Sequence, residues 1–250
     1  MIGIAGGMGP YAGLDLLNKV FDNTLANSDQ EHLDAIILST PSIIDDRTQF
    51  LLGKVKVNPA FAIAKILLKL EKAGATVAGI PCNTAHSDSI FKVIRQELEK
   101  ANSKITLLNM IEETISFIAT TYPSIKKVGV LSTTGSYKNQ LYSAPLEANG
   151  FKVIQPTLAM QENLIHPAIY HPIYGIKTVS NPIHPKAKEN LLKGILYLKE
   201  HGAEAVILGC TEIPLAITES KIYEIITVDP ANILARALIH LQNPDKLKPL

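Results

Sequence analysis

The chain has 250 residues and a mass of 27.2 kDa, enough for one large or two small domains, and 46% of its residues are hydrophobic. Its 24 basic and 23 acidic residues leave a formal charge of +1, which favours neither nucleic acid nor a membrane surface as a partner. No apolar run approaches the roughly 18 residues of a membrane span, and residues 1–4 lack the basic start of a signal peptide. We therefore expect a cytoplasmic globular protein.

The first half of the chain alternates predicted strands and helices. An apolar run over residues 1–5 leads into a glycine turn, after which Leu14, Leu17, Val20 and Phe21 recur at helical spacing. Residues 33–39 are continuously apolar, as expected of a strand covered by helices on both faces. The later segments are predicted as a helix from 61 that ends before Gly74, a strand at 76–81, a helix at 87–100, a strand at 105–108 and a helix at 111–121.

At Lys126 the pattern starts again. Residues 128–131 resemble 2–5, and residues 132–135 occupy the place of the glycine turn. The predicted elements that follow are a helix at 137–149, a strand at 151–155, a helix at 186–201 ended by Gly202, strands at 203–208 and 225–228, and a helix at 230–241. Residues 166–185, rich in proline, tyrosine and histidine, interrupt the repeat, and we expect a loop or lid there.

The two halves are offset by a nearly constant number of residues. Ile2 and Val128 lie 126 residues apart, and the two cysteines, Cys82 and Cys210, lie 128 apart. Such a constant displacement indicates two similar α/β halves, each with a parallel sheet. Because a C-terminal segment of this kind often crosses back to the first half, we expect one domain from residues 1–108 plus 225–250. Residues 109–224 would form the second domain.

The glycine turn matches the dinucleotide fingerprint G-x-G-x-x-A at Gly7, Gly9 and Ala12. A nicotinamide site also needs an acidic residue at the end of the next strand, where this chain has Ser39 and Thr40. The turn therefore favours a small anion near its backbone N–H groups over a nucleotide.

Both cysteines follow an apolar strand and precede a predicted helix. In open α/β folds, ligands bind at the carboxyl ends of the strands, where Cys82 and Cys210 are expected. A chain of this size needs no disulfide, and a reducing compartment would leave both cysteines as free thiols. A buried lone cysteine is commonly inert, but the paired placement favours reactive thiols. A helix N-terminus lowers a thiol pKa from about 8.5 towards about 7, so we expect one thiolate and one thiol near neutral pH.

One thiolate and one thiol are the states needed to move a proton from one face of a carbon atom to the other. A cysteine hydrolase would instead need one cysteine with a histidine, and a redox pair usually has the spacing Cys-x-x-Cys. Three histidines, His166, His171 and His184, each precede proline, with no carboxylate or cysteine at ligand spacing, so we expect no metal.

Four stretches carry a resemblance to a known family: residues 6–10, residues 41–48, residues 81–86 and residues 208–215. Together they closely resemble the cofactor-independent aspartate/glutamate racemases, on the aspartate racemase side, from residue 2 to about residue 240. The resemblance implies two α/β domains related by pseudo-twofold symmetry, an active site in the cleft between them, a homodimer, and no pyridoxal phosphate or other cofactor. Members with both cysteines racemise, whereas relatives that have lost one do other chemistry.

The resemblance also implies roles for individual residues. Cys82 and Cys210 would be the catalytic acid/base pair, and Arg47 and Lys177 would hold the side-chain carboxylate of the substrate. A dicarboxylate needs a charge-assisted donor at its far end, which Arg supplies in two-pronged form. The remaining expected substrate-binding residues are Met8, Asn83, Thr84, Thr133, Thr211 and Glu212.

The leading hypothesis is therefore an amino-acid racemase that interconverts L- and D-aspartate, or glutamate, by two-thiol proton transfer. The alternatives within the superfamily are a racemase of another amino acid or of hydantoin, and an isomerase or decarboxylase of small dicarboxylates. A small-acid-binding protein without turnover is the alternative from a different class.

Overall fold

A computed structural model describes all residues from 1 to 250. The chain divides into two compact units, the first formed by Met1–Glu113 with Ala231–Leu250 and the second by Thr114–Pro230. The boundaries therefore differ from those expected from the sequence. Residues 225–228, which we expected in the first unit, form strand β9 (Ile225–Val228) of the second unit's sheet.

The first unit is built on a four-stranded parallel sheet. Its strands follow the order β2-β1-β3-β4, with bounds β1 Ile2–Gly6, β2 Ala35–Ser39, β3 Val77–Gly79 and β4 Thr106–Leu107. The central strands β1 and β3 are buried throughout. Strand β2 lies at the edge and is mostly half-buried, so helices do not cover both its faces as fully as its apolar sequence predicts.

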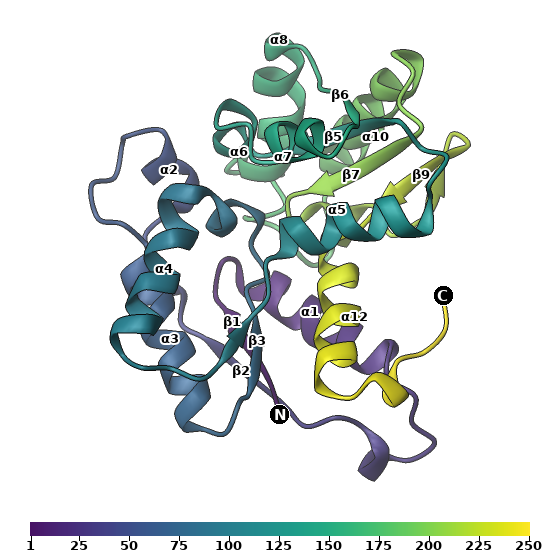
Figure 1. Cartoon of the computed structure of the whole chain (residues 1–250). Coiled ribbons are helices and arrows are strands. Elements are labelled where there is room, and N and C mark those ends of the chain that lie inside the picture. Colours follow the sequence, from purple (N-terminus) through teal and green to yellow (C-terminus); the bar gives the residue numbers. More distant parts are fainter. The chain divides into compact units, whose positions relative to one another are not determined.

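Helices pack on both faces of this sheet (Figure 1). One face is covered by α3 (Ala60–Lys72) and α4 (Asp88–Lys100), and the other by α1 (Pro10–Asp22) and α12 (Pro230–Gln242). Gly74 follows α3 with φ +103°, as predicted for a residue just past a helix C-terminus. The shorter elements are η1 Asp29–Glu31, η2 Pro41–Ile43, α2 Arg47–Leu51, η3 Asn83–His86 and η5 Pro244–Lys246.

The second unit contains a five-stranded sheet in the order β6-β5-β7-β9-β8. The bounds are β5 Lys127–Ser132, β6 Lys152–Ile154, β7 Ala205–Gly209 and β8 Lys221–Ile222, with β9 as given above. All pairs are parallel except β8 with β9. Helices α9 (His166–Tyr170) and α10 (Pro185–Glu200) pack against the central strands β5 and β7. Helix α5 (Met110–Thr121) crosses from the first unit into the second.

The two sheets share one strand order. Strands β2-β1-β3-β4 correspond in chain order and position to β6-β5-β7-β9, and β8 is an addition at the edge of the second sheet. The predicted α/β fold with two similar parallel-sheet domains is therefore confirmed.

The predicted helix at 137–149 is wrong, because two short helices occupy that stretch. Helix α6 (Thr134–Lys138) ends before Gln140, whose φ is +52°, and α7 (Ser143–Ala148) begins three residues later. Pro145 explains the division: a proline is tolerated in the first turn of a helix but breaks a helix interior.

The predicted loop at 166–185 is also more ordered than expected. Helices α8 (Leu158–Met160) and α9 continue through a π-helical turn, Gln161–Ile165 (η4), and Ile169 and Ile176 are completely buried. The backbone N–H groups of Ile176 and Lys177 donate to the carbonyls of Ala168 and Ile169. The segment is thus part of the core of its unit. None of the helices in the chain combines the length and the apolar character that a bilayer crossing requires.

Candidate active site

The two cysteines lie at matching places in the two sheets. Cys82 follows β3 and Cys210 follows β7, each next to the first strand of its own unit, β1 or β5. The chain leaves that first strand to one side and returns on the other, so each cysteine lies at the topological switch point, where open α/β sheets bind ligands.

The local backbone is the same around both cysteines. Cys82 N–H donates to the Ile80 carbonyl at 2.7 Å, and Cys210 N–H donates to the Leu208 carbonyl at 2.9 Å. In the next turn, the Cys82 carbonyl accepts from Ala85 at 3.1 Å and the Cys210 carbonyl accepts from Ile213 at 2.9 Å. Both side chains are buried free thiols, 5% and 4% exposed. The repeat read in the sequence therefore extends to the conformation of the cysteine turns.

In the first unit, Cys82 caps the turn η3, and Asn83 and Thr84 are the first two residues of that turn. Both side chains are buried, as is Met8 just beyond β1, which belongs to the same buried cluster as Cys82. Arg47 begins α2, which contacts η3. The predicted site residues of this unit therefore gather at the carboxyl edge of its sheet.

Arg47 is 8% exposed, an unusual burial for a guanidinium group. The side chain of Asp46 caps α2 by accepting from the N–H of Gln49 at 2.7 Å, and Arg47 Nη1 donates to the Asp45 carbonyl at 3.2 Å. The Asp46 side chain thus fixes the start of the helix that carries Arg47, and the Asp45 carbonyl orients the Arg47 side chain.

The glycine turn after β1 is packed against the chain. Gly7 has φ +98°, and a Cβ atom there would meet the backbone of Thr40 and Pro41 at 3.0 Å. Only glycine combines this φ with such a close backbone approach, so the turn serves to bring β1 and the end of β2 together.

His86 contacts the backbone of the Cys82 turn. Its Nδ1 atom lies 2.9 Å from the Cys82 carbonyl, and its ring stacks on Phe91 with centroids 4.9 Å apart. Burial lowers the pKa of His86 to about 4, although backbone carbonyls around the ring oppose that effect. The imidazole is therefore neutral and structural at neutral pH.

This burial predicts an acid-sensitive contribution to stability. The pKa of His86 is about 6.5 in the unfolded chain and about 4 when folded, so between these values the unfolded chain binds more protons. The free energy of unfolding should fall by about 3 kcal/mol as the pH drops from 6.5 to 4. Urea unfolding over this pH range should show a shallower decline for His86→Gln than for the unmodified protein. An equally steep decline in His86→Gln would contradict this assignment.

In the second unit, Cys210, Glu212 and Lys177 form one connected chain of side chains. Cys210 Sγ donates to Glu212 Oε2 at 3.0 Å, and Glu212 Oε1 forms an ion pair with Lys177 Nζ. Thr211 Oγ1 also donates to Glu212 Oε2 at 3.4 Å. The Glu212 side chain is 3% exposed and that of Lys177 is 19% exposed. Lys177 further lies 5.6 Å from the centroid of the Tyr170 ring.

The expectation that a helix N-terminus lowers the Cys210 pKa is wrong. The helix that follows, α11 (Ile213–Ala216), has only four residues, too few for a sizeable dipole. Burial raises the pKa of Cys210 well above its usual range, and the negative charge of Glu212 raises it further, while Lys177 opposes the rise. Cys210 is therefore a neutral thiol at neutral pH.

Thr133 lies beside the Cys210 turn, because Ser132 at the end of β5 is paired with Gly209 at the end of β7. Its hydroxyl caps α6 by accepting from the N–H of Ser136 at 3.2 Å, and it donates to Ser136 Oγ at 3.1 Å. Thr133, Thr211, Glu212, Lys177 and Cys210 are thus the second group of predicted residues, all within the second unit.

Gln161, a completely buried residue in the π-helical turn, is not among the residues expected from the sequence. Its Nε2 donates to the Ser132 carbonyl at 3.0 Å and lies 3.4 Å from Thr134 Oγ1, which ties the turn to the end of β5. The sequence does contain a pattern that marks Gln161. It lies four residues before Ile165 and eight before Ile169, which makes it a polar residue on an apolar helical face.

The three histidines of residues 166–185 are engaged with tyrosines. His166 stacks on Tyr170 at 4.9 Å and His171 on Tyr174 at 3.8 Å, while His184 lies 5.9 Å from Tyr174. No three His, Cys, Asp or Glu side chains in the chain gather as a group of metal ligands.

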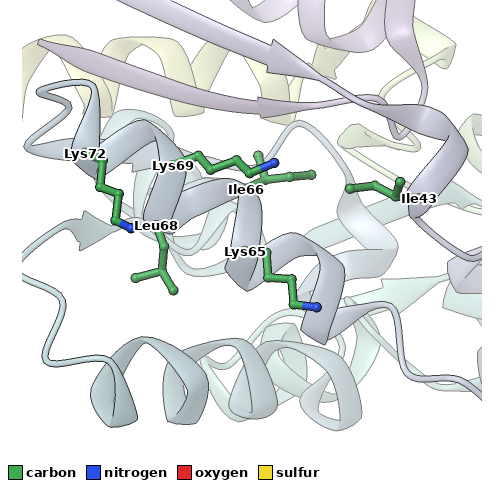
Figure 2. Close-up of a pocket in the computed structure, with 6 residues that line it drawn as sticks. All are labelled: Ile43, Lys65, Ile66, Leu68, Lys69 and Lys72. Carbon is green, nitrogen blue, oxygen red and sulfur yellow. The ribbon is translucent and has the colours of Figure 1, made fainter.

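A hollow of about 260 Å³ lies elsewhere in the first unit, along α3 (Figure 2). Its lining is formed by Ile43, Lys65, Ile66, Leu68, Lys69 and Lys72. In Figure 2, Lys69 and Ile66 point towards Ile43. The hollow includes neither Cys82 nor any other predicted site residue, so it is separate from the cysteine turns.

The chain is similar to known proteins in both sequence and structure. The chain is 30% identical over 245 residues to the broad specificity amino-acid racemase RacX of Bacillus subtilis, with 96% of each chain covered. Aspartate racemase of Picrophilus torridus has a similar structure, with a TM-score of 0.80 and 29% identity over 99% of this chain and 95% of that one. Glutamate racemase of Francisella tularensis shares the fold at 17% identity, with a TM-score of 0.60 over 100% of this chain and 84% of that one.

A family model extends this similarity to nearly the whole sequence. The model described as Asp/Glu/hydantoin racemase matches residues 5–238. The matched region contains both cysteine turns, the switch points on which they lie, and all the residues discussed around them. The chain therefore belongs to the Asp/Glu/hydantoin racemase family.

Proposed function

We propose that this protein racemises a free amino acid by proton transfer between Cys82, Cys210 and the substrate α-carbon. Aspartate is the leading candidate substrate, and glutamate is the second. No pyridoxal phosphate takes part in the proposed reaction. In either direction, one thiolate removes the α-proton while the opposite thiol delivers its own proton to the other face of the carbon. The C–H electron pair stays on the carbon, and the two sulfur atoms exchange protonation states.

The observation that carries the proposal is the matching pair of cysteine turns. Two buried thiols occupy equivalent positions in two similar units, with the same backbone hydrogen bonds before and after each cysteine. A cysteine that only fills space can be replaced by another small apolar residue, so packing alone does not explain why cysteine recurs at this point of both units. Racemisation explains the recurrence, because inversion needs one acid/base group for each face of the carbon.

The chemistry also needs polar groups around the carboxylate of the substrate. An α-proton is far less acidic than a thiol, so donors must stabilise the carbanion-like state. Asn83 and Thr84 next to Cys82, and Thr133 and Thr211 next to Cys210, are buried polar residues suited to that role. We propose that they bind the α-carboxylate and the ammonium group, with Met8 as an apolar neighbour.

Arg47 supports an acidic substrate. A buried guanidinium at the start of α2, next to the Cys82 turn, provides the charge-assisted donor that a side-chain carboxylate requires. The 29% identity to the Picrophilus torridus aspartate racemase supports the same choice.

A broad amino-acid specificity is the second candidate. The Bacillus subtilis relative is described as a broad specificity racemase, and Lys177, expected to bind the side-chain carboxylate, forms an ion pair with Glu212. Because Glu212 already balances the positive charge of Lys177, this lysine favours a dicarboxylate substrate less than a lysine without an acidic partner would.

Deuterium incorporation tests the proposal. The purified protein is incubated with L-aspartate in deuterium oxide without added cofactor, and the product is separated on a chiral column and analysed by mass spectrometry. We expect D-aspartate that carries one solvent deuterium at the α-carbon. Parallel reactions with glutamate, alanine, lysine and a hydantoin distinguish an acidic-substrate racemase from a broad one.

Two results would reject the proposal. Binding of aspartate without exchange of its α-proton would indicate a small-acid-binding protein, and loss of CO₂ or movement of a double bond in a dicarboxylate would indicate another reaction of the superfamily. The expected homodimer and the cytoplasmic location stay predictions.

A further inference from the structure

The Cys210 turn differs from the Cys82 turn in one respect: a carboxylate touches its sulfur. Glu212, two residues beyond Cys210, accepts from Cys210 Sγ through its Oε2 atom at 3.0 Å. The residue two positions beyond Cys82 is Thr84, so the sequence itself differs at this point. The two thiols, alike in backbone, therefore meet different charges.

We infer that Glu212 is a positioning residue whose carboxylate keeps Cys210 protonated in the substrate-free protein. Lys177 weakens this effect, because it neutralises the same carboxylate. The inference deepens the proposed function and rests on it for its catalytic meaning. Cys210 is then the thiol that donates its proton in the first turnover, and Cys82 is the group that must remove the α-proton.

The charges around Cys210 support this assignment. Glu212 comes from the same turn as Cys210, and Lys177 comes from the buried backbone turn after α9. Tyr142, which precedes α7, lies near Gly209, and its pKa is raised above its usual range, mainly by burial and further by Asp229 and Cys210. Tyr142 is thus neutral, and the balance at the sulfur rests on Glu212 and Lys177.

The position of Lys177 is set by the backbone rather than by a flexible lid. Its N–H donates to the Ile169 carbonyl at 3.0 Å, and the neighbouring Ile176 is completely buried. Gly175 makes this turn possible, because a Cβ atom there would lie 2.4 Å from the His171 nitrogen. The cation is therefore held where it can act on Glu212.

A purely structural role explains the pair less well. A buried ion pair contributes little net stability, because desolvating two charges offsets their attraction. Apolar side chains of similar size would fill the space at lower cost. A carboxylate that contacts both the thiol and a cation has instead a direct effect on where the thiol proton resides.

The test measures the titration of Cys210 alone. The chain has two cysteines, so Cys82→Ser leaves Cys210 as the sole thiol, whose ionisation is followed by thiolate ultraviolet absorbance against pH. The Cys82→Ser, Cys210→Ser protein supplies the baseline. In the Cys82→Ser background, Glu212→Gln should raise the thiolate fraction at a given pH about tenfold or more, and Lys177→Met should lower it about tenfold.

An exposed pair provides the matched control. Lys188 and Glu219 lie 2.9 Å apart with side chains 39% and 46% exposed, and Glu219→Gln or Lys188→Met should leave the titration unchanged. No change or a decrease in thiolate with Glu212→Gln would overturn the inference, as would shifts of both site variants in one direction. If one variant fails to fold by circular dichroism, the direction of the other decides.

The titration uses no substrate, so its outcome is separate from that of the proposed function. If the Glu212 and Lys177 variants shift the titration in opposite directions but the protein does not racemise any substrate, only the racemase assignment is rejected. Racemisation with an unchanged titration would reject only the role of Glu212 and Lys177.

Discussion

Replacement of either Cys82 or Cys210 by serine should lower the rate of inversion of aspartate by about 10²–10⁴-fold, the usual contribution of a positioned acid or base. Serine keeps the shape of the side chain but is a far weaker acid than a thiol. Chiral chromatography in deuterium oxide measures the loss for each enantiomer. Because each thiol serves one face of the carbon, a single-cysteine variant should still exchange the α-proton of one enantiomer faster than that of the other.

Ser87→Ala is a suitable control for the Cys82 variant. Ser87 lies five residues along the same turn, is 6% exposed, and caps the start of α4 by its position. Its replacement removes a buried polar atom near the site without touching a thiol, so inversion should continue at nearly the rate of the unmodified protein. Full inversion activity in Cys82→Ser or Cys210→Ser would refute the two-thiol mechanism.

Replacement of Arg47 by methionine should weaken the use of aspartate while leaving the thiol chemistry intact. A hydrogen bond to a charged group contributes about 1.5–3 kcal/mol, which corresponds to a decrease in kcat/KM of roughly 10- to 150-fold. The loss should appear mainly as a higher KM for aspartate and should be smaller for alanine, which has no side-chain carboxylate. Arg47→Lys should recover only part of the loss, because lysine lacks the two-pronged donor.

Arg95 offers a matched cation. It lies on α4 with its guanidinium carbon 4.9 Å from the centroid of the Phe91 ring, and Arg95→Met should leave the KM for aspartate unchanged. Equal losses for aspartate and alanine in Arg47→Met would show that Arg47 supports the structure of α2 rather than the substrate side chain.

Strong local patterns account for what the sequence predicted correctly. The alternation of short apolar runs with amphipathic helices indicates a parallel α/β sheet, because both sheet faces must be covered. Gly74 and Gly202 mark helix ends and have φ of +103° and +89° in the structure, as residues just past a helix often do. The nearly constant offset between the halves predicted two similar units, and the two sheets do share one strand order.

The errors fall where packing competes with periodicity. The stretch at 137–149 looks helical throughout, yet Pro145 requires that a new helix begin just before it. Residues 166–185 look like a polar loop because of their prolines and histidines, but Ile169 and Ile176 anchor them in the core. On α1, Leu14 and Phe21 share helical spacing but are 50% and 36% exposed, while Leu16 and Val20 are buried.

By itself, the sequence determined that two cysteines end equivalent strands in two similar halves, because repeat spacing and strand patterns are local properties of the chain. Only the tertiary structure decided which charges meet each sulfur. Glu212 and Lys177 are 35 residues apart, and no local pattern predicts that they pair beside Cys210. Burial then reverses the expected effect of the following helix, because the loss of water around a thiolate outweighs a four-residue dipole.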